Sequence, residues 1–461
     1  MRLGIVGTGH VGLVTAVGFA SLGHTVVGMD KDAERIARLA RGEPILYEPG
    51  LGDLLQSTLR SGRLRFTTST AEMLDGSDIV FLCVGTPSLR DGRADLSQVE
   101  EAVGGIACQP DGFKLIVEKS TVPVGTGARI ARALGRPVAG LPRYEVASNP
   151  EFLREGSAVH DFLHPDRIVI GADSDRARTL LRELYERDFD CPILLTSLRA
   201  AELIKHAANA FLATKISFIN MVADFCDHVG ADVSDVARAI GLDPRIGPHF
   251  LKAGLGYGGS CFSKDLKAFV WSAVDAGLDF SLLREVERIN IARVARLLQK
   301  LDEALGGLPG KTVGVLGAAF KADTDDIREA PSLSVIARLR EAGAALRVYD
   351  PRAARKLADL WPPDDTLAYA ESAYDAAREA HALAVLTDWD EFRSVDLERL
   401  RRVMRAPVVV DGRNLFEPAK MRAHGFEYHS LGRGDAAAAP MAGSVLASAL
   451  DGRDSAPVPT P

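Results

Sequence analysis

Two glycine-rich segments of this sequence have residue types and spacings that suit chemistry. The first, GTGHVG at residues 7–12, matches the GxGxxG pattern of dinucleotide-binding turns. An apolar strand precedes it, a helical pattern follows it, and Asp30 ends the next expected strand. The Asp30 carboxylate would accept hydrogen bonds from ribose hydroxyls and repel a 2′-phosphate, which favours NAD over NADP. Arg35 nearby could instead attract that phosphate, and a glycine turn without any ligand is the structural alternative.

The second segment is GLGYGGSCFSKD at residues 254–265. Cys261 precedes an expected helix at 263–276, so the helix dipole and Lys264 should both stabilise its thiolate. Asp265 follows four residues later and would share a helix face with the cysteine. The alternative is a buried structural cysteine beside a flexible loop, which describes most free cysteines. The local sequence alone is compatible with both interpretations.

Three further segments have simpler explanations when each is taken alone. Lys205 and Asn209 lie four residues apart on an expected long helix, with Glu202 one turn earlier, a spacing typical of a solvated helix face. The segment Asn149-Pro150-Glu151 has the composition of a helix start, with the asparagine as N-cap. The segment at 120–123, STVP, is typical of a strand that ends in a turn.

The elements that must position these residues form two sets of alternating strands and helices. In the first set, strands are expected at 3–6, 24–29, 78–84, 115–119, 144–148 and 167–171. Long helices are expected from about residue 198 and at 279–305. In the second set, strands are expected at 311–316, 345–349, 382–387 and 407–410, and Asp350 follows the second of them as Asp30 does in the first set.

This pattern predicts an α/β fold with two doubly wound, Rossmann-like domains joined by a long-helix central region. The expected domains are residues 1–197, which bind NAD, 198–306, which are helical and carry the cysteine loop, and 307–432, a second α/β domain. Residues 433–461 are rich in alanine, proline and serine and are expected to be disordered.

The composition of the 461-residue chain excludes several classes of protein. The net charge of −7 does not favour a nucleic-acid partner, and no apolar run is long enough for a membrane span. Five scattered cysteines without a CxxC pair predict neither a disulfide framework nor a zinc site, so no metal is expected. The N-terminus lacks the features of a secretory signal, and a cytoplasmic location is expected.

Taken in order along the chain, the segments resemble the UDP-glucose/GDP-mannose dehydrogenase family. The resemblance rests on GTGHVG, VGTP at 84–87, STVPVGT at 120–126, NPEFLREGSAVHDFLHPDRIVIG at 149–171, AELIKHAANA at 201–210, GYGGSCFSKD at 256–265, FKADTDDIREAP at 320–331 and DGRNLF at 411–416. It extends to about residue 432 and implies an NAD domain, a central helical dimerisation region and a C-terminal nucleotide-sugar domain. A homodimer formed through the long helix is therefore expected.

The resemblance also implies a reaction. The family oxidises the primary alcohol of a sugar nucleotide twice and reduces two NAD. Cys261 would capture the intermediate aldehyde as a thiohemiacetal, and the second oxidation would give a thioester that water hydrolyses. UDP-glucose, converted to UDP-glucuronate for polysaccharide biosynthesis, is the expected substrate. GDP-mannose or a UDP-N-acetyl-hexosamine remains an alternative.

The family pattern assigns a role to each polar residue near the cysteine. Lys205 would stabilise oxyanions, and Asp265 and Asn209 would organise the hydrolytic water. Glu151 and Thr121 would support proton transfer and thioester hydrolysis. The pattern does not decide which of Glu151, Lys205 and Asp265 donates or accepts the proton in each step.

The same pattern assigns the two binding sites. The cofactor residues are Gly7, Gly9, His10, Val11, Gly12, Asp30, Arg35, Thr86, Thr121, Glu155, Lys264 and Arg328. The substrate residues are Glu151, Phe152, Leu153, Lys205, Asn209, Arg245, Phe250, Lys252, Gly254, Tyr257, Gly258, Cys261, Phe320, Lys321 and Arg413. Arg245 is expected to reach the site of the partner subunit. Without the resemblance, Arg245 and Arg413 would be interpreted as ordinary surface arginines.

Two other classes of function account for only part of this pattern. A hydroxyacid dehydrogenase that oxidises its substrate once shares the NAD domain and the long helix. It offers no reason for Cys261 in a glycine-rich loop or for a second α/β domain. A protein that binds NAD without catalysis would be favoured if Cys261, Lys205 or Asp265 were absent, and all three are present.

Overall fold

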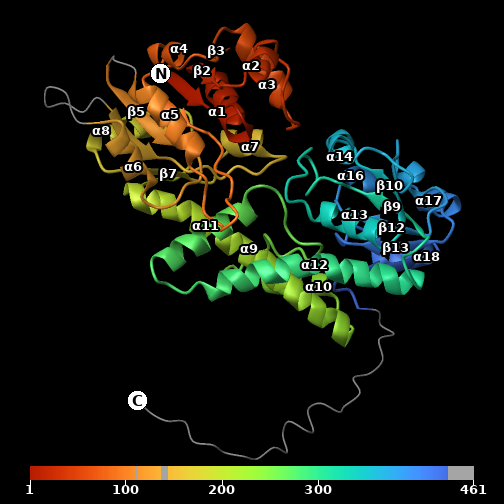
Figure 1. Ribbon diagram of the computed structural model, residues 1–461. Helices are drawn as coiled ribbons and strands as arrows, with labels where there is room; N and C mark the ends of the chain where they lie inside the picture. Colours follow the sequence, from red (N-terminus) through yellow and green to blue (C-terminus); the bar gives the residue numbers. More distant parts are fainter. Residues whose placement is uncertain (109–111, 136–143, 435–461) are drawn as a thin grey trace, which may run out of the picture.

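The computed structural model describes residues 1–108, 112–135 and 144–434, which form two largely parallel sheets joined by long helices (Figure 1). This arrangement confirms the predicted fold class. The expected disordered tail begins at residue 433, and from residue 435 onward it lies outside the described residues. None of the helices in the described part of the chain combines the length and the apolar composition needed to cross a bilayer.

The first sheet has eight strands within the described ranges. In spatial order they are β3 (Leu64–Thr67), β2 (Thr25–Met29), β1 (Arg2–Val6), β4 (Ile79–Leu82), β5 (Lys114–Glu118), β6 (Tyr144–Ser148), β7 (Ile168–Ala172) and β8 (Ile193–Thr196). Neighbouring strands are parallel except β6 and β7, which are antiparallel. The connecting helices are α1 (His10–Ser21), α2 (Ala33–Ala40), α3 (Leu51–Arg60), α4 (Thr70–Asp75), α5 (Ser97–Ala107), α6 (Thr126–Ala133), α7 (Ala158–Leu163) and α8 (Asp175–Glu186).

Both faces of this sheet are buried, which explains why its central strands are continuous apolar runs. In β4, Ile79 and Phe81 belong to one hydrophobic core. Val80 and Leu82 belong to a separate core on the opposite face. This alternation follows from the two-residue period of a strand and requires helices on both sides of the sheet.

The central region is built from α9 (Leu198–Val229), α10 (Val233–Gly241), α11 (Phe262–Asp275) and α12 (Ser281–Leu305). The 32-residue helix α9 is about 48 Å long at 1.5 Å per residue. The Ser197 hydroxyl caps its N-terminus by accepting a hydrogen bond from the Ala200 N–H, and Gly230, with φ of 73°, ends it. Because α9 packs against β7, α11 and α12, it connects the first sheet to the rest of the molecule (Figure 1).

The second sheet has six described strands, all parallel. Their order is β11 (Leu367–Tyr369), β10 (Ala345–Tyr349), β9 (Thr312–Leu316), β12 (Ala382–Val385), β13 (Val408–Asp411) and β14 (Glu427–Ser430). The accompanying helices are α13 (Pro331–Glu341), α14 (Ala354–Leu360), α15 (Ala373–Ala377), α16 (Asp390–Arg393), α17 (Leu397–Val403) and α18 (Pro418–Ala423).

The interpretation of Asn149 as a helix N-cap is wrong. Residues 149–154 are not helical, and the next helix, α7, begins at Ala158. The buried Asn149 side chain instead donates to the Val169 carbonyl (2.8 Å) and accepts from Lys119 Nζ (3.0 Å). It therefore ties three strand ends together beside Glu151, so a capping role does not account for Glu151.

Candidate active site

The glycine turn between β1 and α1 has the geometry of a cofactor cradle. A Cβ atom on Gly12 would lie 1.8 Å from the Gly7 carbonyl oxygen, and Gly7 itself has φ of 88°, so the backbone requires both glycines. A Cβ on Gly9 would meet nothing within 4 Å. The open space at Gly9 faces the N-terminus of α1, where backbone N–H groups favour an anion. The turn therefore fits the pyrophosphate of NAD.

Asp30 follows β2 and holds Arg35 beside it. The Asp30 Oδ2 atom accepts hydrogen bonds from the Thr8 N–H (2.9 Å) and from Arg35 Nη1 (2.9 Å). Burial alone would raise the pKa of Asp30, but the hydrogen bonds from Thr8 and Asp32 and the charge of Arg35 lower it below its ordinary value. Because Asp30 neutralises Arg35, this arginine is not a free cation for a 2′-phosphate, in agreement with NAD as the cofactor.

Other predicted cofactor residues come together from both sheets. His10 Nε2 lies 3.2 Å from Glu48 Oε2, and Arg328 Nη2, in the loop between β9 and α13, lies 3.6 Å from Glu155 Oε1. Burial, with the nearby Asp326 carboxylate, raises the pKa of Glu155 to about 7, although His10 and Arg328 oppose this shift. The Glu155 carboxyl group therefore marks a junction where the first sheet meets the second.

Cys261 lies at the N-terminal end of α11 and is partly buried. Burial raises the pKa of its thiol to about 11, and the Glu151 and Asp265 carboxylates add to this effect. Lys264 and Lys205 lower the pKa of Cys261, as the sequence predicted for Lys264, but they do not outweigh burial. Burial of Cys261 therefore opposes the thiolate stabilisation that the sequence predicts from Lys264.

The long helix α9 presents its polar residues to this cysteine and not to solvent. Lys205 Nζ lies 3.2 Å from Glu151 Oε1, and Asn209 Nδ2 donates to Asp265 Oδ2 at 2.6 Å. Lys264 Nζ donates to the other Asp265 oxygen at 2.5 Å. Burial by itself would lower the pKa of Lys205, yet Glu151, Asp265 and Cys261 together raise it, so Lys205 is a buried cation.

Thr121 lies in a loop that α9 anchors. The Glu202 carboxylate, buried and not solvated, accepts from the Gly125 N–H (2.6 Å) and the Gly127 N–H (2.8 Å). His206 Nε2 lies 2.9 Å from the Val122 carbonyl oxygen. The role of His206 was not predicted, because a single histidine on an apolar helix carries no signal of such a contact.

Two residues of α12 fix the glycine-rich loop that precedes Cys261. Asn290 accepts from the Tyr257 N–H (2.9 Å) and donates to the Tyr257 carbonyl (3.0 Å). Arg293, which is 1% exposed, donates from Nε to the Gly254 carbonyl at 3.1 Å. Sequence reasoning missed both residues. The spacing of an amide and an arginine three positions apart on one helix is the signal that was present.

The carboxyl edge of the second sheet closes the other side of this loop. Arg413 donates to the carbonyls of Leu386 (2.7 Å), Gly256 (2.9 Å) and Phe320 (2.8 Å), so it is a half-buried structural link and not an ordinary surface arginine. A cavity of about 50 Å³ lies next to it, lined by Ile216, Lys252, Ala253, Gly254, Gly256, Asp388 and Arg413. Asp388 was not predicted.

The aromatic and glycine residues of the predicted substrate site lie around the same loop. The Phe250 ring, held by a backbone with φ of 64°, contacts the Phe262 ring at 6.3 Å between centroids. Lys205 Nζ lies 5.3 Å from the centroid of the Phe152 ring. A Cβ on Gly258 would lie 2.6 Å from the Glu329 carbonyl oxygen, so this glycine permits contact with the second α/β unit. Leu153 donates its N–H to Glu151, and Lys321 is adjacent to Phe320.

Arg245 is the predicted residue that the structure does not bring to this site. Its side chain is 87% exposed and pairs with Asp243 at 2.7 Å.

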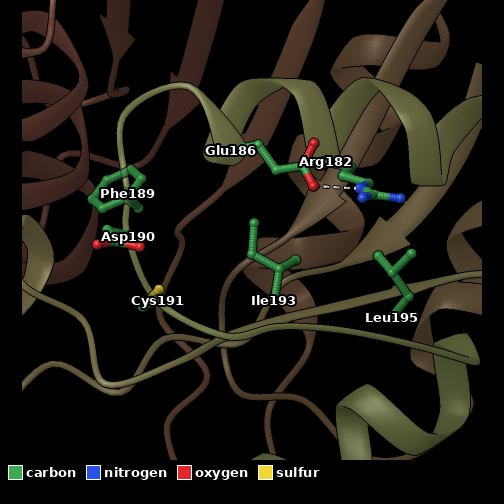
Figure 2. A pocket seen from close by; sticks show the side chains of 7 residues that line it. All are labelled: Arg182, Glu186, Phe189, Asp190, Cys191, Ile193 and Leu195. Carbon is green, nitrogen blue, oxygen red and sulfur yellow. Dashed lines mark hydrogen bonds and ion pairs between the residues drawn. The ribbon is translucent and has the colours of Figure 1, made fainter.

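A larger cavity lies elsewhere, at the outer edge of the first sheet (Figure 2). Its volume is about 340 Å³, and its lining residues are Arg182, Glu186, Phe189, Asp190, Cys191, Ile193 and Leu195. Figure 2 shows the Arg182–Glu186 ion pair on one wall of this cavity. None of the predicted site residues lines it, so the chemistry is concentrated at Cys261.

A dinucleotide turn on the first sheet and a partly buried cysteine beside acidic and basic side chains indicate the class of NAD-dependent dehydrogenases. Three models of the UDP-glucose/GDP-mannose dehydrogenase family match the chain: the NAD binding domain at residues 1–188, the central domain at 199–292 and the UDP binding domain at 314–418. The chain belongs to this family and is an NAD-dependent oxidoreductase.

Relatives of known name match nearly the whole chain. UDP-glucose 6-dehydrogenase TuaD of Bacillus subtilis is 44% identical over 94% of this chain and 93% of its own length. UDP-glucose 6-dehydrogenase of Rhizobium meliloti is 46% identical over 94% of this chain and 100% of its own length. The solved UDP-glucose dehydrogenase from Pyrobaculum islandicum superposes with a TM-score of 0.87, at 42% identity over 94% of this chain and 98% of that chain.

Proposed function

We propose that the enzyme oxidises the primary alcohol of UDP-glucose twice, giving UDP-glucuronate, through intermediates bound to Cys261. The observation that carries this proposal is the placement of the Cys261 thiol beside Lys205, Glu151 and Asp265. Two relatives named UDP-glucose 6-dehydrogenases, at 44% and 46% identity, support the choice of sugar nucleotide. The match of residues 314–418 to a UDP binding domain supports the nucleotide.

The first oxidation removes a hydride and a proton from the alcohol and leaves an aldehyde. Bound NAD would accept the hydride in each oxidation. The Glu151 carboxylate, paired with Lys205 at 3.2 Å, is placed to take up or relay the hydroxyl proton. Lys205 stabilises negative charge that develops on the substrate oxygen, because it is a buried cation.

The cysteine then keeps the aldehyde in the site. The sulfur adds to the aldehyde carbon, and the thiol proton ends on the former carbonyl oxygen, which gives a thiohemiacetal. Because the thiolate is the nucleophile, the proton must leave the sulfur as the carbon–sulfur bond forms. Loss of a second hydride and of that hydroxyl proton gives a thioester. The Asn209–Asp265 pair orients a water that releases the carboxylate and returns the thiol.

We also infer a homodimer that forms through α9. Phe211, Phe218 and Phe225 are 66%, 48% and 66% exposed and lie seven residues apart, so they form one apolar stripe along the helix. Contiguous exposed apolar surface is typical of interfaces between proteins. In such a dimer the exposed Arg245 of one subunit would be available to the active site of the other.

Replacement of Phe218 by glutamate tests the dimer. A charge in the middle of the stripe should be strongly unfavourable at an apolar interface, so light scattering should report a monomer where the unmodified protein is a dimer. The matched control is Leu360→Glu, because Leu360 is 50% exposed at the end of α14, away from the stripe. A dimer that survives Phe218→Glu would place the interface elsewhere.

Counting the NADH formed for each UDP-glucose consumed tests the reaction itself, since two oxidations require two NAD.

A further inference from the structure

Asp388 is a charged group in the small cavity beside the glycine-rich loop, and the proposed reaction does not use it. It follows β12 at the carboxyl edge of the second sheet. In the second sheet β9 lies between β10 and β12. The strands that follow β9 are therefore added first on one side of it, as β10 and β11, and then on the other side, as β12 to β14. Ligands of open α/β sheets bind in the crevice at such a switch point.

The surroundings of Asp388 keep it ionised. Burial alone would raise the pKa of Asp388, but the charges of Arg413 and Lys252 hold it below its ordinary value. Lys252 Nζ donates to Asp388 Oδ2 at 2.5 Å. The hydrogen bonds of Arg413 among the described residues go to three backbone carbonyls, and its effect on Asp388 comes from its charge.

Asp350 holds the position in the second sheet that Asp30 holds in the first. However, the hydrogen-bond acceptor positions of its carboxylate are occupied by groups of the protein itself. Asp350 follows β10 and accepts from the N–H groups of Ala318 (2.7 Å) and Ala319 (3.0 Å), and from Trp389 Nε1 (3.1 Å). It also accepts from two N–H groups in its own loop and is 3% exposed. Asp350 therefore has no free lone pair for a ligand.

Asp388 differs from Asp350 in both respects. Its side chain is 25% exposed and lines the cavity, and Lys252 is its hydrogen-bond donor among the other described residues. A carboxylate only accepts hydrogen bonds, so the ligand atoms beside it must be donors, whereas a diphosphate would be repelled. In a nucleoside diphosphate, the ribose hydroxyls are vicinal donors that a carboxylate accepts well.

We propose that Asp388 binds the ribose hydroxyls of the sugar nucleotide and makes the enzyme selective for ribonucleotides. This inference rests on the proposed use of a UDP-sugar. Asp388 is then a substrate-binding residue, and its ion pair with Lys252 neutralises it enough to coexist with a diphosphate nearby.

The test compares UDP-glucose with 2′-deoxy-UDP-glucose, and UDP with 2′-deoxy-UDP. The unmodified enzyme should prefer the ribose form by about tenfold or more, both in kcat/KM and in the dissociation constant from calorimetry. In Asp388→Ala this ratio should fall to about one, and in Asp388→Asn, which keeps a weaker neutral acceptor, to an intermediate value. Asp390→Ala is the matched control, because Asp390 is 98% exposed, and it should keep the ratio of the unmodified enzyme.

The ratio of ribose to 2′-deoxyribose ligands distinguishes loss of ribose recognition from general damage to the fold. General damage would weaken the binding of both ligands equally. An unchanged ratio in Asp388→Ala, or an unmodified enzyme without preference for ribose, would overturn the inference. If UDP binds with the expected preference while UDP-glucose is not oxidised, the proposed reaction fails and the role of Asp388 stands.

Discussion

Replacement of Cys261 by alanine is expected to lower the rate of acid formation by at least about a thousandfold, because removal of a catalytic nucleophile eliminates the covalent path. The first oxidation does not need the sulfur, so small amounts of aldehyde should form and one NADH should accompany each. Binding of NAD should be nearly unchanged, since the glycine turn at residues 7–12 is a separate structure. Mass spectrometry of the sugar-nucleotide products, together with NAD titration, measures both effects.

Cys191→Ala is the matched control for this prediction. Cys191 is also a free, partly exposed cysteine, but it lines the cavity at the edge of the first sheet shown in Figure 2. Its replacement should leave acid formation unchanged. Acid production by Cys261→Ala at the rate of the unmodified enzyme would rule out the covalent mechanism.

Replacement of Lys205 by methionine is expected to lower kcat by about a hundredfold to a thousandfold, the usual cost of removing an oxyanion-stabilising group. Its Nζ is the cation 3.2 Å from Glu151, and it also lowers the pKa of Cys261. Both oxidations should slow, so NADH formation should fall without accumulation of aldehyde. Stopped-flow measurement of NADH separates this result from that of Cys261→Ala.

The methionine variant leaves the buried Glu151 without its partner, and stability should be checked by thermal unfolding. Lys205→Arg keeps the charge and should recover part of the rate. Lys300→Met is the control, because Lys300 on α12 also pairs with an acid, Asp227 at 3.1 Å, but is remote from Cys261 in sequence and fold. Full activity in Lys205→Met would contradict the role given to this lysine.

The strands that the sequence did not reveal are all edge strands. β3 and β8 end the first sheet, and β11 and β14 end the second. Their sequences, LRFT, ILLT, LAY and EYHS, are short, and most contain charged or exposed residues. An edge strand is covered on fewer sides, so it need not be an apolar run, and the pattern that predicts a central strand is absent. The central strands, buried on both faces, were predicted to within a few residues.

The same reasoning explains what could be predicted of the site. The glycine turn and the cysteine loop are local motifs, and both were predicted from residues close together in sequence. Asn290, Arg293 and Asp388 act on backbone or on residues distant in sequence, so a local pattern, such as the three-residue spacing of Asn290 and Arg293, does not show what they contact. The raised pKa of Cys261 was missed for a related reason, because the burial that causes it depends on the folded structure and not on the neighbouring residues in sequence.

The most direct test of the double oxidation is to count NADH. Purified enzyme with excess NAD and a limiting, known amount of UDP-glucose should produce two NADH for each sugar nucleotide consumed, with UDP-glucuronate as the product. A ratio of one, with the aldehyde as the final product, would contradict the thioester path through Cys261. No NADH from UDP-glucose, but two per molecule from GDP-mannose or a UDP-N-acetyl-hexosamine, would keep the chemistry and refute the substrate.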